Sequence, residues 1–226
     1  FFSAHDAHAA TKYWIGTSGG SFASDLNWST TNGGSNDTTA PTSADVATFT
    51  SADVDNAAVD STIDVSGINM VSGYTGNITQ SAGVDVTVGT GNFVVADGTF
   101  TGSNGLITVT GSFTLSGGTF VASSGTTTFK GNFTYTSGTY THSSGTTFFD
   151  AVGSSTIAAN TLNFNNVTFG KNIGGGPGIT TVTQSFTVLG NLVVSNADNI
   201  GYTIQIQSSS STNPTITVNG DLSFPS

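Results

Sequence analysis

Apolar and polar residues alternate along most of the chain in short runs that glycine and serine interrupt. Between residues 111 and 150, Phe113, Leu115 and Phe120 alternate in this way with threonine and serine. A period of two places successive side chains on opposite faces of a β-strand. Thr, Phe, Tyr and Val favour extended backbone, whereas Gly and Ser favour turns. The pattern therefore predicts many short strands, each with an apolar and a polar face.

Residues 111–150 consist of two copies of one 20-residue sequence. GSFTLSGGTFVASSGTTTFK (111–130) aligns without a gap with GNFTYTSGTYTHSSGTTFFD (131–150), and eleven positions are identical. Phe113 aligns with Phe133, and Phe129 with Phe149. A fixed period of this length is the signature of a stacked repeat protein. One copy cannot bury its apolar face alone, but it can do so when it is stacked on the next.

We therefore predict an all-β fold, a β-solenoid and most simply a right-handed parallel β-helix with rungs of about 20 residues. A rung is one turn of the solenoid, and strands of successive rungs pair in parallel roughly 4.8 Å apart. Phe93, Phe113 and Phe133 each follow a Gly-Asn or Gly-Ser corner, so we expect them to stack inside. The alternative, an antiparallel sandwich, also has short strands at regular spacing, but its strands do not repeat residue for residue.

The chain divides into three regions. Residues 1–12 form an N-terminal arm or a signal-peptide remnant, since Ala7-His8-Ala9 resembles a cleavage site. Residues 13–75 form a capping region with the first rungs, and residues 76–226 form the solenoid repeats. An irregular loop near 170–180 interrupts these repeats, and residues 162–169 are expected to form a strand pair.

Residues 13–50 resemble the start of bacterial β-strand-repeat surface proteins, of the autotransporter-passenger-like and adhesin-like β-helix kind, in which a W-x-G…N-W-S…P…A-D-x-A-x-F pattern opens the β-helix. The matching residues are Trp14, Gly16, Asn27, Trp28, Ser29, Pro41, Asp45, Ala47 and Phe49. The resemblance implies a β-helix at a cell surface. Large aromatic side chains are suited to closing the first rung. The alternative is that the Trp residues stack on a sugar ring.

Charge is scarce and acidic, with three Lys, no Arg, thirteen Asp and a net charge of −10. This balance argues against binding to nucleic acid or to an anionic membrane surface, because both require clustered Lys or Arg. No apolar run approaches the roughly 20 residues of a membrane span. The absence of Cys excludes disulfides. A Thr-, Ser-, Asn- and Gly-rich chain of this kind is typical of an extracellular or cell-surface protein.

The residue types exclude most catalytic sites. The chain lacks Cys, Glu and Arg, and a Ser-His-Asp triad needs a His held between the other two residues. His142 aligns with Ala122 of the preceding repeat, so we expect it to point outward. The two His residues of the N-terminal arm lack further ligands nearby. We therefore expect neither catalytic residues nor enzymatic activity.

One acidic segment allows a metal alternative. Asp53-Val54-Asp55 offers carboxylate oxygens to Ca²⁺ but lacks the glycine of an EF-hand loop. The simpler interpretation places these Asp residues outside and Val54, with Val59, inside. We expect no cofactor, with calcium as the open alternative.

We expect an extracellular structural or adhesive surface protein, a self-assembling filament or surface-layer subunit. The alternative is a carbohydrate-binding or polysaccharide-cleaving β-helix. The expected partners are further copies of the chain, glycans or a host surface. The residues expected at subunit contacts are Phe1, Phe2, Leu222 and Phe224. Five Asn-x-Ser/Thr sequons are expected on the outside, where they could carry glycans; they are Asn27, Asn36, Asn77, Asn132 and Asn166.

Overall fold

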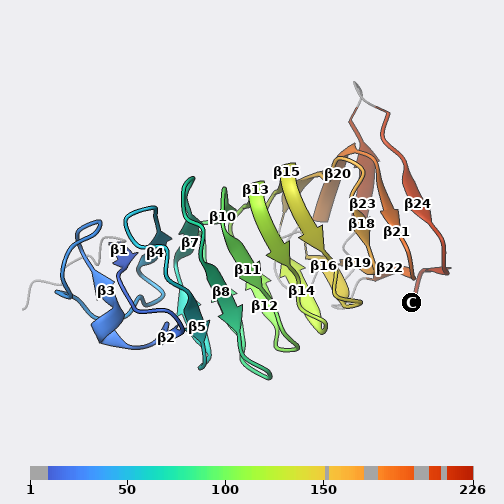
Figure 1. The fold of residues 1–226 in the computed structure, drawn as a ribbon. Helices are drawn as coiled ribbons and strands as arrows, with labels where there is room; N and C mark the ends of the chain where they lie inside the picture. The colour runs from blue at the N-terminus through green and yellow to red at the C-terminus, as the bar shows by residue number, and fades with distance from the viewer. Residues whose placement is uncertain (1–9, 151–152, 171–177, 196–203, 210–212, 226) are drawn as a thin grey trace, which may run out of the picture.

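The computed structural model describes residues 10–150, 153–170, 178–195, 204–209 and 213–225. Short strands wind into one elongated coil that progresses from the N-terminal to the C-terminal end of the chain (Figure 1). The fold is an all-β solenoid of about seven turns with parallel stacked sheets, which confirms the predicted fold class. Phe1, Phe2 and residues 171–177 of the expected loop lie outside the described residues.

Three faces run along the solenoid, and we call them A, B and C. Face A contains β1 (Thr11–Trp14), β4 (Val46–Phe49), β7 (Gly67–Met70), β10 (Phe93–Val95), the first halves of β13 (Phe113–Val121) and β15 (Phe133–Thr141), β17 (Ser154–Ala158), β20 (Gly178–Gln184) and β23 (Ile204–Ser208). Face B contains β2 (Gly20–Ser21), β5 (Ala57–Val59), β8 (Asn77–Gln80), β11 (Thr99–Thr101) and the second halves of β13 and β15.

Face C contains β6 (Ile63–Val65), β9 (Val86–Val88), β12 (Ile107–Val109), β14 (Thr126–Phe129), β16 (Thr146–Asp150), β19 (Asn166–Gly170), β22 (Leu192–Ser195) and β25 (Leu222–Ser223). A separate three-stranded sheet contains β18 (Asn163–Phe164), β21 (Phe186–Val188) and β24 (Ile216–Val218). The pairing within all of these stacks is parallel, which excludes the antiparallel sandwich.

The tandem repeat stacks in the register that its sequence predicts. Phe93 pairs with Phe113, and Phe113 pairs with Phe133. Phe129 pairs with Phe149 on face C. All five rings are buried, and those of Phe113 and Phe133 stack with centroids 5.2 Å apart. The predicted inner aromatic ladder is therefore confirmed.

Corner side chains link successive rungs. Asn92 has a left-handed backbone with φ of 71°, and its Oδ1 accepts a hydrogen bond of 2.8 Å from the backbone N–H of Ser112. Asn166 accepts from the N–H of Asn191, which in turn accepts from the N–H of Asp221. Asn tolerates this backbone conformation and offers a short acceptor. The Gly-Asn corners thus fix the height of each rung relative to the next.

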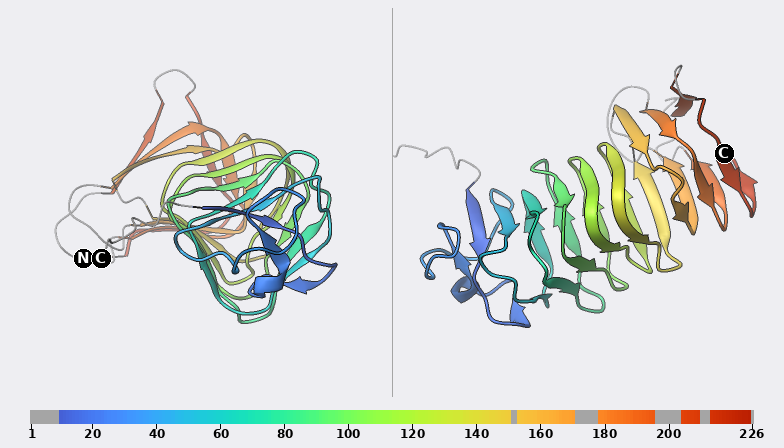
Figure 2. Two further views of the ribbon diagram at one scale, coloured as in Figure 1. Left: turned by 90° about the vertical axis from the view of Figure 1, so that its left-hand side faces the viewer. Right: turned by 45° about the horizontal axis from the view of Figure 1, so that its top comes forward.

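The rung geometry changes after β15. On face C, paired residues from Ile107 to Val167 are 20 positions apart, but the partner of Val167 is Leu192, 25 positions on. Strand β17 pairs only with the first two residues of β15, so face B ends there. Seen end-on in Figure 2, the orange and red strands extend beyond the outline of the earlier rungs.

Two local predictions were wrong. Residues 162–169 do not form a strand pair, because β18 and β19 belong to different sheets and each pairs with other rungs. Val54 is 44% exposed, whereas Val59 is buried as expected. Val54 precedes β5, where the chain turns, so the alternation of the strand does not extend to it.

The Phe133→Ala substitution should lower the free energy of unfolding by about 3–5 kcal/mol, because it opens a cavity in the core. The Phe133 ring packs against five other rings, at centroid distances of 5.0–6.1 Å; they are Phe113, Phe129, Tyr140, Phe149 and Phe164. Chemical denaturation measures the change. Phe148→Ala is the matched control, because Phe148 lies on the outer side of β16 and is only half-buried. Equal losses for the two variants would contradict the register.

Candidate functional site

An aromatic cluster closes the N-terminal end of the solenoid. Trp14, Phe22, Trp28 and Phe49 are each at most 1% exposed, and the ring centroids of Phe22 and Trp28 are 4.8 Å apart. The indole N–H of Trp28 donates to the carbonyl of Phe22 at 2.8 Å. Strand β3 (Trp28–Ser29) pairs antiparallel with β1, following the 3-10 helix η1 (Asp25–Asn27). The two Trp rings are inaccessible, so the hypothesis that they stack on a sugar is wrong.

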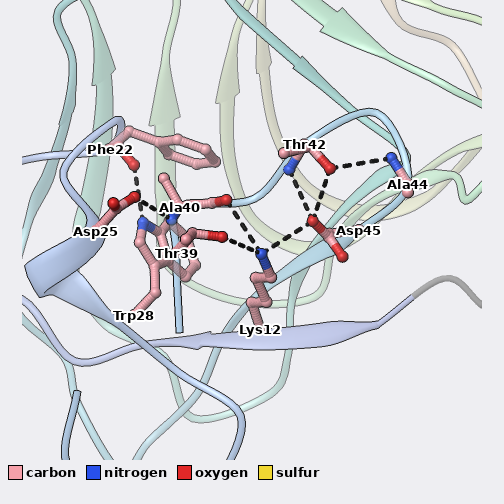
Figure 3. A network of polar contacts seen from close by, with 9 residues as sticks. All are labelled: Lys12, Phe22, Asp25, Trp28, Thr39, Ala40, Thr42, Ala44 and Asp45. Carbon is pink, nitrogen blue, oxygen red and sulfur yellow. Dashed lines mark hydrogen bonds and ion pairs between the residues drawn. The ribbon is translucent and has the colours of Figure 1, made fainter. Parts of the chain in front are cut away.

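Lys12 is the first residue of an inward-facing column of stacked residues on face A. Its register partners are Ala47 and then Ile68, both buried apolar residues. The Lys12 Nζ lies 3.0 Å from Asp45 Oδ2 and donates to Thr39 Oγ1 at 3.0 Å and to the Ala40 carbonyl at 3.1 Å (Figure 3). All three contacts lie within residues 39–45, which we call the capping loop. This cation therefore ties β1 to the capping loop.

The carboxylate of Asp45 is held as an anion. Its Oδ2 accepts hydrogen bonds from the backbone N–H and the hydroxyl of Thr42, at 2.9 and 2.8 Å. Burial opposes the charged form, but the hydrogen bonds from Thr42 and Lys12 outweigh it and lower the pKa of Asp45 below its ordinary value. The Asp45 carbonyl also accepts the N–H of Ser66 from the next rung. Asp45 is thus a structural residue of the cap.

Further residues of the sequence pattern support the same cap. A Cβ atom at Gly16 would lie 2.5 Å from the Trp14 ring, so only glycine fits beneath this indole. The side-chain amide of Asn27 donates to the carbonyl of Ser21 at 2.8 Å. The residues singled out by the resemblance therefore meet at one end of the solenoid, where they close its core.

The last described rung leaves its apolar side chains uncovered. Leu222 is 54% exposed and Phe224 is 70% exposed. Leu192, the partner of Leu222 one rung earlier, is only 5% exposed. Asp221 takes the corner position of Asn191, and among the described residues its carboxylate has no hydrogen-bond partner. The predicted contact residues Leu222, in β25, and Phe224, directly after it, thus belong to the last described rung, near the C-terminus marked in Figure 1.

The acidic segment before β5 forms a turn. The Oδ1 of Asp53 accepts the N–H of Asp55 at 3.0 Å, and the Tyr74 hydroxyl donates to the Asp55 carbonyl. Burial, the largest cause, raises the pKa of Asp53. Among the described residues, no group of three or more His, Cys, Asp or Glu side chains is placed to hold a metal ion.

His142 is half-buried, and its Nδ1 accepts the N–H of Ser144 at 3.0 Å. The aligned Ala122 is buried, so the two aligned positions differ in exposure. The cause is the left-handed turn at Ser143 and Ser144, which folds the imidazole over its own corner.

The sequons differ in the availability of their amide nitrogen. Asn36 and Asn132 are exposed, whereas Asn27, Asn77 and Asn166 are half-buried. The nitrogens of Asn27 and Asn36 donate to backbone carbonyls within the cap. All five are therefore at least partly exposed, as expected, but the amides of Asn27 and Asn36 are engaged in hydrogen bonds of the cap.

The described part of the chain contains no ligand-sized pocket. None of its helical segments has the length and apolar character needed to cross a lipid bilayer. The structure defines a β-solenoid with a covered N-terminal rung and exposed apolar side chains in its last described rung. No protein-family model, curated protein or solved structure matches the chain.

The Asp45→Asn substitution should lower the free energy of unfolding by about 3 kcal/mol at pH 7, because it leaves the buried Lys12 ammonium without its counter-charge. Replacing both partners, as in the Lys12→Met/Asp45→Leu double variant, should restore part of this loss. Denaturation in urea measures both changes. The Asp64→Asn substitution, at an exposed position in β6, is the control and should have little effect.

Acid should weaken the cap through the same carboxyl. Because the pKa of Asp45 is lowered by folding, its stabilising contribution is complete above the unfolded value of about 3.9. The contribution is lost as the pH falls below that value towards the folded pKa. As the pH falls below about 5, the free energy of unfolding should therefore decrease less in the Asp45→Asn variant than in the wild type. The difference should correspond to the protonation of roughly one carboxyl group. Parallel losses in the two proteins would contradict this role.

Proposed function

We propose that the chain is an extracellular structural or adhesive surface protein that self-associates through the C-terminal end face formed by Leu222 and Phe224. The observation that carries the proposal is the difference between the two ends. The aromatic cluster and β3 cover the N-terminal end, whereas the last described rung exposes an aliphatic and an aromatic side chain. An uncovered strand and its apolar residues form a template for further pairing.

The same difference restricts the geometry of a filament or surface layer. Head-to-tail stacking of rungs needs a free edge at both ends. Strand β3 covers β1 at the N-terminal edge of face A, so rung-on-rung contact favours the C-terminal end face. The composition, poor in charged residues and rich in Thr, Ser and Gly, supports a location outside the cell. The alternative of a carbohydrate-active β-helix has less support, because both Trp side chains are buried.

Light scattering coupled to size-exclusion chromatography, followed by electron microscopy, tests the proposal. The wild type should form pairs or larger assemblies, and Leu222→Asp should be a monomer with an unchanged circular dichroism spectrum. Leu106→Asp is the matched control, because Leu106 directly precedes β12 of face C and is 51% exposed, yet it lies on the side of the solenoid. This variant should assemble as the wild type does. A wild type that stays monomeric at high concentration would refute self-association.

A further inference from the structure

Face B carries an array of threonines that the functions considered above leave unused. On each of β8, β11, β13 and β15, the two residues flanking the inward Ile, Phe or Tyr point outward. We call these outward residues the threonine array; they are Asn77, Thr79, Thr99, Thr101, Thr119, Val121, Thr139 and Thr141. Six of the eight are Thr, and none is charged.

The array is in register from rung to rung. Thr99 pairs with Asn77 on one side and with Thr119 on the other, and Thr119 pairs with Thr139. The second column runs in parallel through Thr101. The bulges between β13 and β15 lie before Thr119, so they do not disturb the columns. Two straight columns thus cross four neighbouring strands.

The hydroxyl groups of the array are available and preordered. Thr101 Oγ1 donates to Asn77 Oδ1 at 3.0 Å. Within the described residues, the other five Thr hydroxyls have no hydrogen-bond partner; they are those of Thr79, Thr99, Thr119, Thr139 and Thr141. Because a β-branched side chain on a strand has few rotamers, ordering these groups against a ligand costs little entropy.

The spacing of the array matches a lattice of water. Neighbouring rungs lie about 4.8 Å apart, and the two columns are about 6.7 Å apart along each strand. In a tetrahedral network of hydrogen bonds of about 2.75 Å, oxygen atoms repeat at about 4.5 Å in one direction and about 7.3 Å in the perpendicular direction. The rung mismatch of about 0.3 Å adds up to only about 1 Å over four rungs.

We propose that the threonine array is an ice-binding face. The Thr methyl and hydroxyl groups hold surface water in positions that continue into the ice lattice. Face C is a poor match for the same ligand, since Asp64 and Phe148 interrupt the outer side of its strands. A crystalline polysaccharide is the other regular hydroxyl surface, but the outward side of the array offers no aromatic ring on which a sugar would stack.

Thermal hysteresis and inhibition of ice recrystallisation test the proposal on the purified chain. The wild type should separate the freezing point from the melting point and keep ice grains small. Thr119→Lys, at the centre of the array, should lose most of both activities. Thr128→Lys is the matched control, because Thr128 is half-buried on the outer side of a central strand of the same repeat copy. It should retain both activities, and circular dichroism should be unchanged in both variants.

The outcomes separate the possible ligands. A wild type without hysteresis and without effect on recrystallisation overturns the proposal, as does an equal loss in the two Lys variants. If the wild type shows no ice activity but binds crystalline cellulose or chitin, and Thr119→Lys alone removes this binding, the ligand of the array is a polysaccharide and the ice proposal is overturned. The proposal does not rest on self-association, because one copy carries the whole array. Measuring Leu222→Asp in the same assays distinguishes failure of one proposal from failure of the other.

Discussion

The parallel main-chain ladder, with equivalent residues directly above one another, is the constraint on which the rest of this structure depends. It forces each inner column to be filled by side chains of compatible size. On face A the column passes through Phe93, Phe113 and Phe133. The phenylalanine rings of face A are large, and the inner column of face C has the smaller side chains of Thr127 and Thr147 at this level. The other residues of that column are aliphatic. Burying the two threonine hydroxyls is costly unless they are paired; Thr127 accepts the N–H of Ser123, and Thr147 meets the Tyr140 hydroxyl.

Because all rungs stack in the same direction, the two ends of the solenoid are different. A parallel stack does not terminate by itself, because its edge strands keep unpaired N–H and C=O groups. A different structural element must therefore cover the first rung. Here an antiparallel strand and the aromatic cluster provide the cover, and the Lys12–Asp45 pair ties β1 to the capping loop. A buried ion pair contributes little net stability compared with an apolar pair. At this place the Lys12 ammonium holds the capping loop against β1 through three contacts, and we infer that its value is specificity of position.

The sequence was informative wherever the chain repeats itself. The alignment of Phe113 with Phe133 determined the register of the central rungs, because residue-for-residue repetition leaves no freedom to slip. The sequence did not reveal the contact of Lys12 with Asp45, which are 33 positions apart in a region that does not repeat. The change of rung shape after β15 was equally hidden, because it follows from the turn at Asn160 and Thr161. The outer Thr-x-Thr spacing was visible, but its register across four strands became apparent only from the structure.

The point at which the rungs change shape also separates the two proposed surfaces. Face B ends at β15, because the turn at Asn160 and Thr161 leads into β18, which does not pair with the second half of β15. The threonine array therefore belongs to the regular rungs, whereas Leu222 and Phe224 belong to the rungs that follow the step. Contacts at the end face lie along the solenoid axis, and contacts at face B lie perpendicular to it. Assembly through the end face would therefore leave the array of each copy uncovered, and a pair joined in this way carries two arrays. Multivalent presentation of this kind strengthens weak adsorption without any new contact.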